Sequence, residues 1–234
     1  MNTAREKLAT GACAHCPTQN YCIAACLNDT QLFELEQAMN LGSQLAPGEH
    51  LFVAGDLAAH QYHVRSGCLK SYYITTSGDE HVTGFFLAGE ILPSFNVNGK
   101  HAQSAVALNN VSVCAIDLGA DVSAPVWRAI TEHTQQMMNA AVTHQLNSKS
   151  PTAQSRVAGF CIDLMQRLAK LERAPTYIPT PMSRRDIASY LGITPESLSR
   201  ALTSMKQTGV IAADRHHIEI LRPDQLRSLA PQLS

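Results

Sequence analysis

Short apolar runs alternate with turn residues through the middle of the chain, and this pattern predicts a β-domain. From about Leu45 to Asp117, β-branched and aromatic residues gather in short runs, bounded by turn residues at a spacing of roughly eight to twelve residues. The expected strands are residues 51–53, 62–64, 69–74, 81–87, 105–108 and 111–116. Strands of this length and spacing favour an antiparallel sandwich or barrel.

A helix is predicted on each side of this β-domain. Before it, residues 28–30 offer helix caps for a short helix, whose apolar face would hold Leu32, Phe33, Leu35 and Met39. After it, residues 122–147 repeat a stripe every three or four positions, as in a coiled-coil seam. The seam positions are Val126, Ile130, His133, Met137, Ala141 and His144. We expect a long helix that could pair with a second copy and that ends at Ser150 and Pro151.

A second amphipathic helix should start at Thr152 or Ser155, beyond a domain boundary at that proline. Its apolar face would hold Val157, Phe160, Cys161, Leu164, Met165, Leu168 and Leu171. We expect Cys161 to be a small buried residue of this face. Residues 175–181, which begin and end with proline, suggest a stiff polar connection.

Residues 182–202 have the pattern of a helix-turn-helix. Ser183 can cap a helix that ends at Leu191, Gly192 supplies the turn, and Thr194 with Pro195 starts a new helix. Apolar residues at 187, 188, 191, 193, 198, 202 and 205 would pack the two helices together. Glu196, Ser197, Ser199 and Arg200 are then left on the outer, amino-terminal part of the second helix, where a recognition helix meets base edges.

Residues 210–213 and 218–221 predict a two-stranded wing beside this helix pair. A helical hairpin inside an enzyme is the alternative, but the basic surroundings favour DNA. Residues 151–234 contain eleven Lys and Arg against seven Asp and Glu, a net charge of +4, whereas residues 1–150 carry −5. A basic carboxyl-terminal part suits a polyanionic partner.

Composition places the chain among globular proteins. It has 234 residues, of which 45% are hydrophobic and 16% charged, enough for two domains with apolar cores. No apolar run is long enough to span a bilayer and no secretory segment follows Met1, so we expect a cytoplasmic location.

The cysteines carry the candidate chemistry. Of the seven, Cys13, Cys16 and Cys22 form the pattern C-x2-C-x5-C, and Cys26 follows closely. An odd number in a reducing compartment argues for ligands or redox thiols rather than a disulfide framework. Thiolates grouped in this way bind a soft metal or an iron-sulfur cluster, and their spacing does not distinguish the two.

Together, these stretches resemble the cyclic-AMP receptor protein superfamily, and specifically its fumarate-and-nitrate-reduction regulator (FNR) branch. The resemblance extends from about Gly11 to Leu229. It rests on the amino-terminal cysteines with Cys114 on a late strand, on Arg65-Ser66-Gly67, Gly78-Asp79-Glu80 and Gly84-Phe85-Phe86-Leu87-Ala88-Gly89-Glu90, and on Glu196-x2-Ser199-Arg200.

The resemblance implies an α+β fold: a cyclic-nucleotide-binding-like β-barrel (jelly roll), a long dimerisation helix and a winged helix-turn-helix. The expected segments are a cysteine-rich segment at 1–30, a sensor domain at 31–121, the dimerisation helix at 122–150 and the DNA-binding domain at 151–234. The resemblance further implies a [4Fe-4S] cluster held by Cys13, Cys16, Cys22 and Cys114. The cluster would be lost in oxygen and would favour a homodimer that binds TTGAT-type half-sites in double-stranded DNA.

Side-chain chemistry suggests a role for each residue on the DNA surface. Arg200 suits the acceptors of guanine, Glu196 can accept from a cytosine amino group, and Ser199 can reach a base edge. Arg184 and Arg185, at the start of the helix pair, suit phosphate contacts.

Three features depart from the family pattern. The segment between Met138 and Phe160 is about seven residues short, which costs the helix seam roughly 10 Å. Residues 94–99 differ from the family loop that contacts RNA polymerase, a further possible partner. Pro17 removes a backbone donor beside Cys16, from which we expect altered oxygen sensitivity.

Four other functions compete with this interpretation. The thiols could hold structural zinc in a regulator of the same fold. A cyclic-nucleotide sensor would need an arginine for the phosphate, and residues 99–105 contain none. His63, His81 or His133 could be an axial haem ligand. A thiol oxidoreductase would use C-x2-C, but no strand-helix redox context surrounds Cys13, so we do not expect an enzyme.

Overall fold

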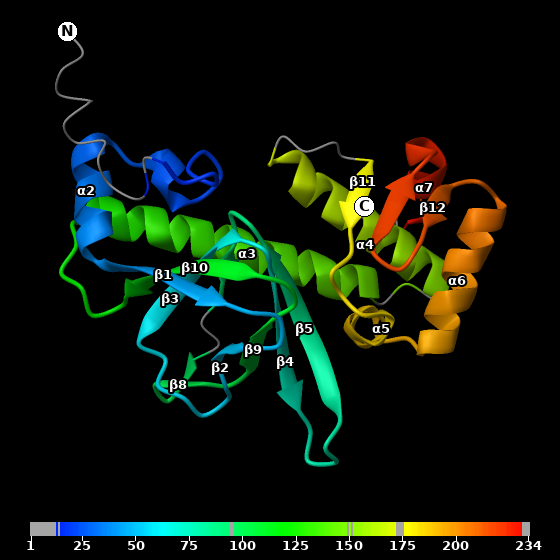
Figure 1. Ribbon diagram of the computed structural model, residues 1–234, viewed down its shortest axis with the longest axis horizontal. Coiled ribbons are helices and arrows are strands. Elements are labelled where there is room, and N and C mark those ends of the chain that lie inside the picture. Colours follow the sequence, from blue (N-terminus) through cyan, green and yellow to red (C-terminus); the bar gives the residue numbers. More distant parts are fainter. Residues whose placement is uncertain are drawn as a thin grey trace, which may run out of the picture. The chain divides into compact units, whose positions relative to one another are not determined.

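The computed structural model describes residues 13, 15–93, 96–148, 150, 152–171 and 176–230, without the side chains of 40–42, 96 and 140–148. The chain divides into two compact units. The first contains Met1–Tyr73 and Phe85–Ala140, and the second contains Ile74–Gly84 and Ala141–Ser234. Figure 1 labels the elements, which are described below.

The β-domain has two four-stranded antiparallel sheets. One has the order β1 (Met39–Leu45), β10 (Val111–Asp117), β3 (His60–Ser66) and β6 (Ile91–Leu92). The other has the order β2 (His50–Phe52), β9 (Ser104–Ala107), β4 (Cys68–Ile74) and β5 (Glu80–Leu87). β7 (Asn96–Val97) pairs with β8 (Lys100–His101). All six predicted strands are confirmed, but among the described residues the strands form separate sheets and do not close into a barrel.

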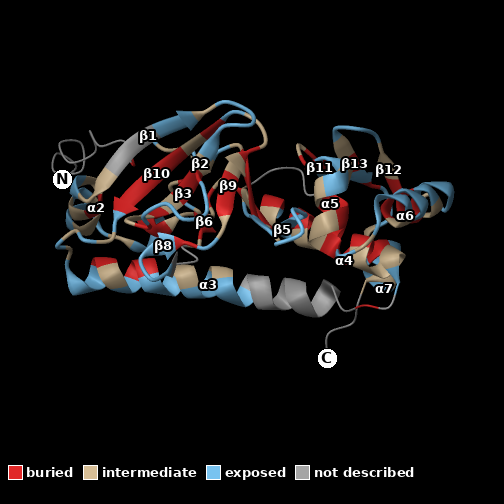
Figure 2. Cartoon of the chain, turned by 90° about the horizontal axis from the view of Figure 1, so that it is seen from below, coloured by how far each residue is buried: buried red, intermediate tan, exposed pale blue. Residues whose placement is uncertain are grey.

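The sheet that contains β10 is buried on both faces. Val64 and Val113 point into the interior of the β-domain, where they pack with Phe52, Leu69, Leu92 and other buried apolar residues. Because side chains alternate along a strand, Ile116 points to the opposite face. There it packs with Leu35 of α2 (Asp29–Gln37) and with Val126 and Ile130 of α3 (Ala124–Ser148). Figure 2 shows the buried residues of α3 in its first half.

This packing corrects two predictions. Val126 and Ile130, predicted for a dimer seam, are buried against the chain's own sheet, with 0% and 3% of their surface exposed. Met39 lies in strand β1, not in the preceding helix, and Phe33 is 51% exposed. The helix itself forms because Asn28 and Gln31 cap it reciprocally.

The second unit packs three helices and a small sheet around α4 (Ala153–Ala169), which Thr152 caps. All the predicted apolar residues of this helix from Val157 to Leu168 are buried, including Cys161. The other helices are α5 (Arg184–Leu191), α6 (Pro195–Gln207) and α7 (Pro223–Leu229). The sheet has the order β11 (Tyr177–Pro179), β13 (His217–Ile220) and β12 (Ile211–Ala213).

The wing therefore has three strands rather than two. Residues 177–179, predicted as a connection, form the edge strand β11, because Ile178 is fully buried and pairs with Ile218. Pro179 is tolerated because edge strands accept proline.

Some expectations lie outside the described residues. These are the helix stop at Pro151, the seam side chains of Ala141 and His144, and Ser94 in the loop that departs from the family pattern. Within the described part of the chain, no helix has both the length and the apolar character needed to cross a membrane.

Candidate metal centre and DNA-binding surface

Three of the predicted metal ligands lie on a loop of successive backbone turns. The amide of Cys16 donates to the carbonyl of Cys13 at 3.1 Å, and the amide of Cys22 donates to the carbonyl of Thr18 at 3.0 Å. Cys22 then precedes the short 3-10 helix η1 (Ile23–Cys26). The amide of Cys13 donates to Oε1 of Glu36 at 2.8 Å, which fixes the start of the loop on α2.

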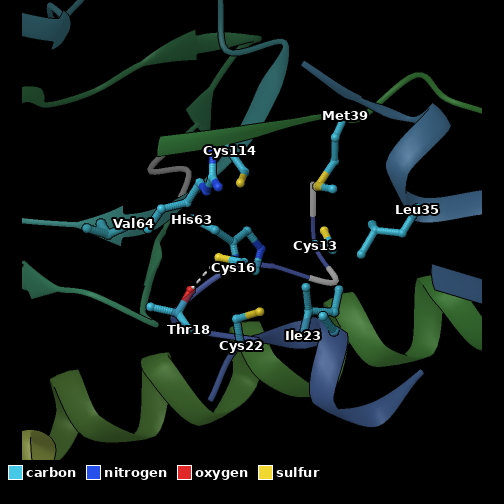
Figure 3. Close-up of a pocket in the computed structure, with 12 residues that line it drawn as sticks. Cys13, Cys16, Thr18, Cys22, Ile23, Leu35, Met39, His63, Val64 and Cys114 are labelled. Carbon is cyan, nitrogen blue, oxygen red and sulfur yellow. Dashed lines mark hydrogen bonds between the residues drawn. The ribbon is translucent and has the colours of Figure 1, made fainter. Parts of the chain in front are cut away.

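The loop and strand β10 enclose one cavity of about 20 Å³ that all four predicted ligands line. Figure 3 shows Cys13, Cys16 and Cys22 around it, with Cys114 reaching it from β10. Cys13 and Cys114 are buried, and Cys16 and Cys22 are half-buried. Cys26 is exposed and does not line the cavity. The fold thus brings together thiols that are distant in sequence and leaves the neighbouring one outside.

The thiols share the cavity without converging on one point. In the described residues, no three His, Cys, Asp or Glu side chains lie close enough to hold a single metal ion. The cavity has room for about one water molecule, so a metal group larger than this requires the loop to move outward.

The surroundings of the thiols affect their ionisation differently. Burial, reinforced by the Glu36 carboxylate and the other thiols, raises the pKa of Cys13 to about 12. Burial also raises the pKa of Cys114 to about 11. At Cys16 burial opposes ionisation, but hydrogen bonds from Thr18 and Arg65 outweigh it and lower the pKa. Since thiolates are the metal-binding form, metal uptake must release protons from Cys13 and Cys114.

Two residues of strand β3 lie at the cavity beside the predicted ligands. Arg65 bonds the thiol of Cys16, and His63 lines the cavity wall. The sequence pattern indicated Arg65 only as part of the motif Arg65-Ser66-Gly67, and His63 only as a candidate haem ligand. The alternation of β3 could have indicated them, since both point away from Val64, but the pairing of β3 with β10 had to be known.

The helix-turn-helix forms as the sequence predicts. Ser183 and Asp186 cap α5 reciprocally, and Gly192 ends it in the left-handed region at φ 61°. The Thr194 hydroxyl accepts the amide of Ser197 at 3.1 Å and so starts α6. The buried face of α6 contains Leu198, Ala201, Leu202 and Met205.

The opposite face of α6 presents the predicted base-reading residues. Glu196, Ser199 and Arg200 are exposed, whereas Ser197 is half-buried. The guanidinium of Arg200 donates to Oγ of Ser197 at 3.2 Å. Ser197 therefore bonds both the helix start and the arginine, which suits it to positioning Arg200 on this face.

The two arginines at the start of α5 differ in their surroundings. Arg185 is exposed, while Arg184 is half-buried and donates a hydrogen bond to the carbonyl of Asp214 in the wing. Between α6 and the wing lies a cavity of about 350 Å³ lined by Arg184, Ser199, Lys206 and Arg215, among others. The lining holds three cationic side chains and one acidic one, Asp214, and this excess of positive charge suits a DNA backbone.

A sensor-type β-domain, a long helix and a winged helix-turn-helix together define a class of DNA-binding transcription regulators. Residues 43–120 match the cyclic nucleotide-binding domain, and residues 155–229 match the Crp-like helix-turn-helix domain. The chain belongs to the CRP/FNR family of transcription regulators, in its FNR branch.

Relatives of the whole chain support this assignment. The chain is 32% identical to the fumarate and nitrate reduction regulatory protein of Salmonella typhimurium, over 96% of this chain and 94% of the relative. It is 31% identical to the protein of the same name from Vibrio cholerae, over 97% and 95%. The structure of FixK2 from Bradyrhizobium japonicum is similar, with a TM-score of 0.73 and 25% identity over 83% of this chain and 100% of that chain.

The fold is shared more widely. A CRP-family transcriptional regulator from Thermus thermophilus has a TM-score of 0.67 at 17% identity, over 80% of this chain and 95% of that chain.

Proposed function

We propose that this DNA-binding regulator responds to oxygen through a [4Fe-4S] cluster held by Cys13, Cys16, Cys22 and Cys114. As a homodimer it binds TTGAT-type palindromes. The observation that carries the proposal is the shared cavity of these four thiols. The names of the full-length relatives also support it. Four cysteines are the usual donor set of such a cluster, so the residues fit the group.

The chain's own packing offers a route from the cavity to α3. Ile23 follows Cys22 directly, and Ile116 lies two residues after Cys114 on the same face of β10. Both isoleucines pack in one apolar cluster with Val126 and Ile130 of α3. A displacement of the cysteine loop therefore changes what this part of the helix packs against. When bound, the cluster would supply oxygen-labile bonds that tie the loop to β10.

The carboxyl-terminal half of α3 then carries the dimer contact in this proposal. Val126 and Ile130, near the start of α3, are buried against the chain's own sheet. Met138, further along the helix, is 59% exposed. Two copies would place two α6 helices in successive major grooves, so a palindrome binds far more tightly than a single half-site.

The exposed face of α6 reads the bases. Arg200 donates to guanine, Glu196 accepts from cytosine, and Ser199 contacts a base edge, while Ser197 holds Arg200. Arg185 binds a phosphate. Arg184, the other predicted phosphate contact, donates a hydrogen bond to the wing. It also lines the cavity beside α6, and a phosphate bound there would contact it.

The decisive experiment compares anaerobically purified and air-exposed protein. We expect visible charge-transfer absorption, four iron and four sulfide per chain, dimer mass and tight binding to a TTGAT-N4-ATCAA duplex, all lost in air. Equally tight binding before and after air exposure would contradict oxygen control.

A matched pair of variants tests the ligand set. Cys22→Ser should abolish iron and sulfide loading, whereas Cys26→Ser should load normally, because Cys26 is exposed and outside the cavity. A colourless wild-type protein with one zinc per chain would instead establish the structural-zinc alternative.

A further inference from the structure

His63 lies directly beside a proposed cluster ligand. In the antiparallel pairing of β3 with β10, His63 is the partner of Cys114. Directly paired residues point to the same face of a sheet, so the imidazole and the Cys114 thiol are neighbours on the cavity side. Val64, the next residue along, points instead into the interior of the β-domain.

The imidazole of His63 is buried and its polar atoms are unsatisfied. Only 4% of its surface is exposed, and neither Nδ1 nor Nε2 has a hydrogen-bond partner among the described residues. The ring of His133 on α3 lies edge-on, with the ring centroids 6.0 Å apart. A buried donor without a partner is energetically unfavourable, so a hydrogen-bond acceptor at this position would stabilise the site.

The chemistry of the cavity indicates the missing partner. Whether neutral or protonated, the imidazole of His63 carries at least one N–H donor. The other wall of the cavity consists of thiols, and the thiolate and sulfide atoms of a bound cluster are acceptors.

We propose that His63 is a positioning and tuning residue that donates its ring N–H to a sulfur of the cluster or of the Cys114 thiolate. The inference rests on the proposed function and adds one residue to it. A hydrogen bond to a cluster sulfur stabilises the more negatively charged, more reduced state. His63 should therefore slow the oxidation that begins cluster loss in air.

The test compares three variants with the wild type after anaerobic cluster assembly. His63→Leu removes the donor at similar bulk, His63→Gln restores an N–H donor, and His133→Leu alters the neighbouring ring, which does not line the cavity. Iron and sulfide content, the resonance Raman Fe–S stretching bands and the rate of bleaching in air are measured for each.

We expect His63→Leu to load the cluster, to shift the Fe–S stretching bands to higher frequency and to bleach about tenfold faster. His63→Gln and His133→Leu should remain near the wild type. If His63→Leu fails to fold, His63→Met against His63→Gln makes the same comparison.

Two outcomes would overturn the inference, and they are distinguishable. A loaded wild type whose bands and bleaching rate match those of His63→Leu would remove the role of His63 and leave the cluster in place. A wild type that acquires no iron and sulfide without oxygen would overturn the proposed function as well.

Discussion

The side chain of Arg65 forms a hydrogen bond with the thiol of Cys16 and so joins strand β3 to the cysteine loop. The same guanidinium also lowers the cost of a thiolate at Cys114, where it opposes the effect of burial on the pKa. The guanidinium of Arg65 thus favours the thiolate form of one proposed ligand on the loop, Cys16, and of one on strand β10, Cys114.

Replacing Arg65 should make Cys16 less reactive. In the metal-free chain, Arg65→Gln removes a positive charge and a donor, so the pKa of the Cys16 thiol rises and its alkylation at pH 7 slows. Peptide mass spectrometry after timed alkylation measures the rate at Cys16. Arg65→Lys, which keeps the charge, should lie between Arg65→Gln and the wild type. An unchanged rate in Arg65→Gln would show that Thr18 alone governs the thiol.

Arg200 and Arg185 should differ in how they affect DNA binding. Arg200→Ala should cost about 1–3 kcal/mol and relax discrimination at one base pair, because a bidentate contact to guanine is lost. Arg185→Ala should weaken binding to all sequences alike and reduce its salt dependence. Titrations against the palindrome and single-base variants at several salt concentrations measure both effects. A uniform loss in both variants would refute the base-reading role of Arg200.

Gly67 and Gly78 offer a matched test of backbone constraint. Both have positive φ, 85° and 87°, but a Cβ at Gly67 would lie 2.3 Å from the carbonyl oxygen of Asn110, whereas nothing lies within 4 Å at Gly78. Gly78→Ala should therefore cost only the conformational term, about 1–2 kcal/mol. Gly67→Ala should cost clearly more in chemical denaturation. Equal losses would mean that the turn at Gly67 relaxes.

Cys161 should make the second unit sensitive to alkaline pH. Burial raises the pKa of this thiol to about 12, whereas in the unfolded chain it ionises from about pH 9. The unfolded state therefore loses its proton first, and stability falls between pH 9 and 12 by up to about 1.4 kcal/mol per pH unit. Thermal unfolding at pH 8, 9 and 10 should show a steeper loss for the wild type than for Cys161→Ala. If the wild type and Cys161→Ala lose stability equally between pH 8 and 10, Cys161 is not the source of the pH dependence.

Local signals in the sequence determined most of the second unit. The caps Ser183 and Thr194, the turn at Gly192 and the buried positions of α4 and α6 appear where the pattern places them. These features depend on neighbours within one or two helical turns, so the sequence alone specifies them. The sequence alone also indicated three of the four proposed ligands, Cys13, Cys16 and Cys22, because they lie close together on one loop.

Only the tertiary structure decided which distant residues meet. The pairing of β3 with β10 puts His63 beside Cys114 and Arg65 at the same cavity, and no spacing in the sequence fixes that register. Likewise, α3 has one apolar stripe that could face a partner or its own sheet, and Val126 and Ile130 face the sheet. Hydrophobic periodicity indicates that one face of a helix is buried, but which surface covers that face depends on how the strands and helices pack.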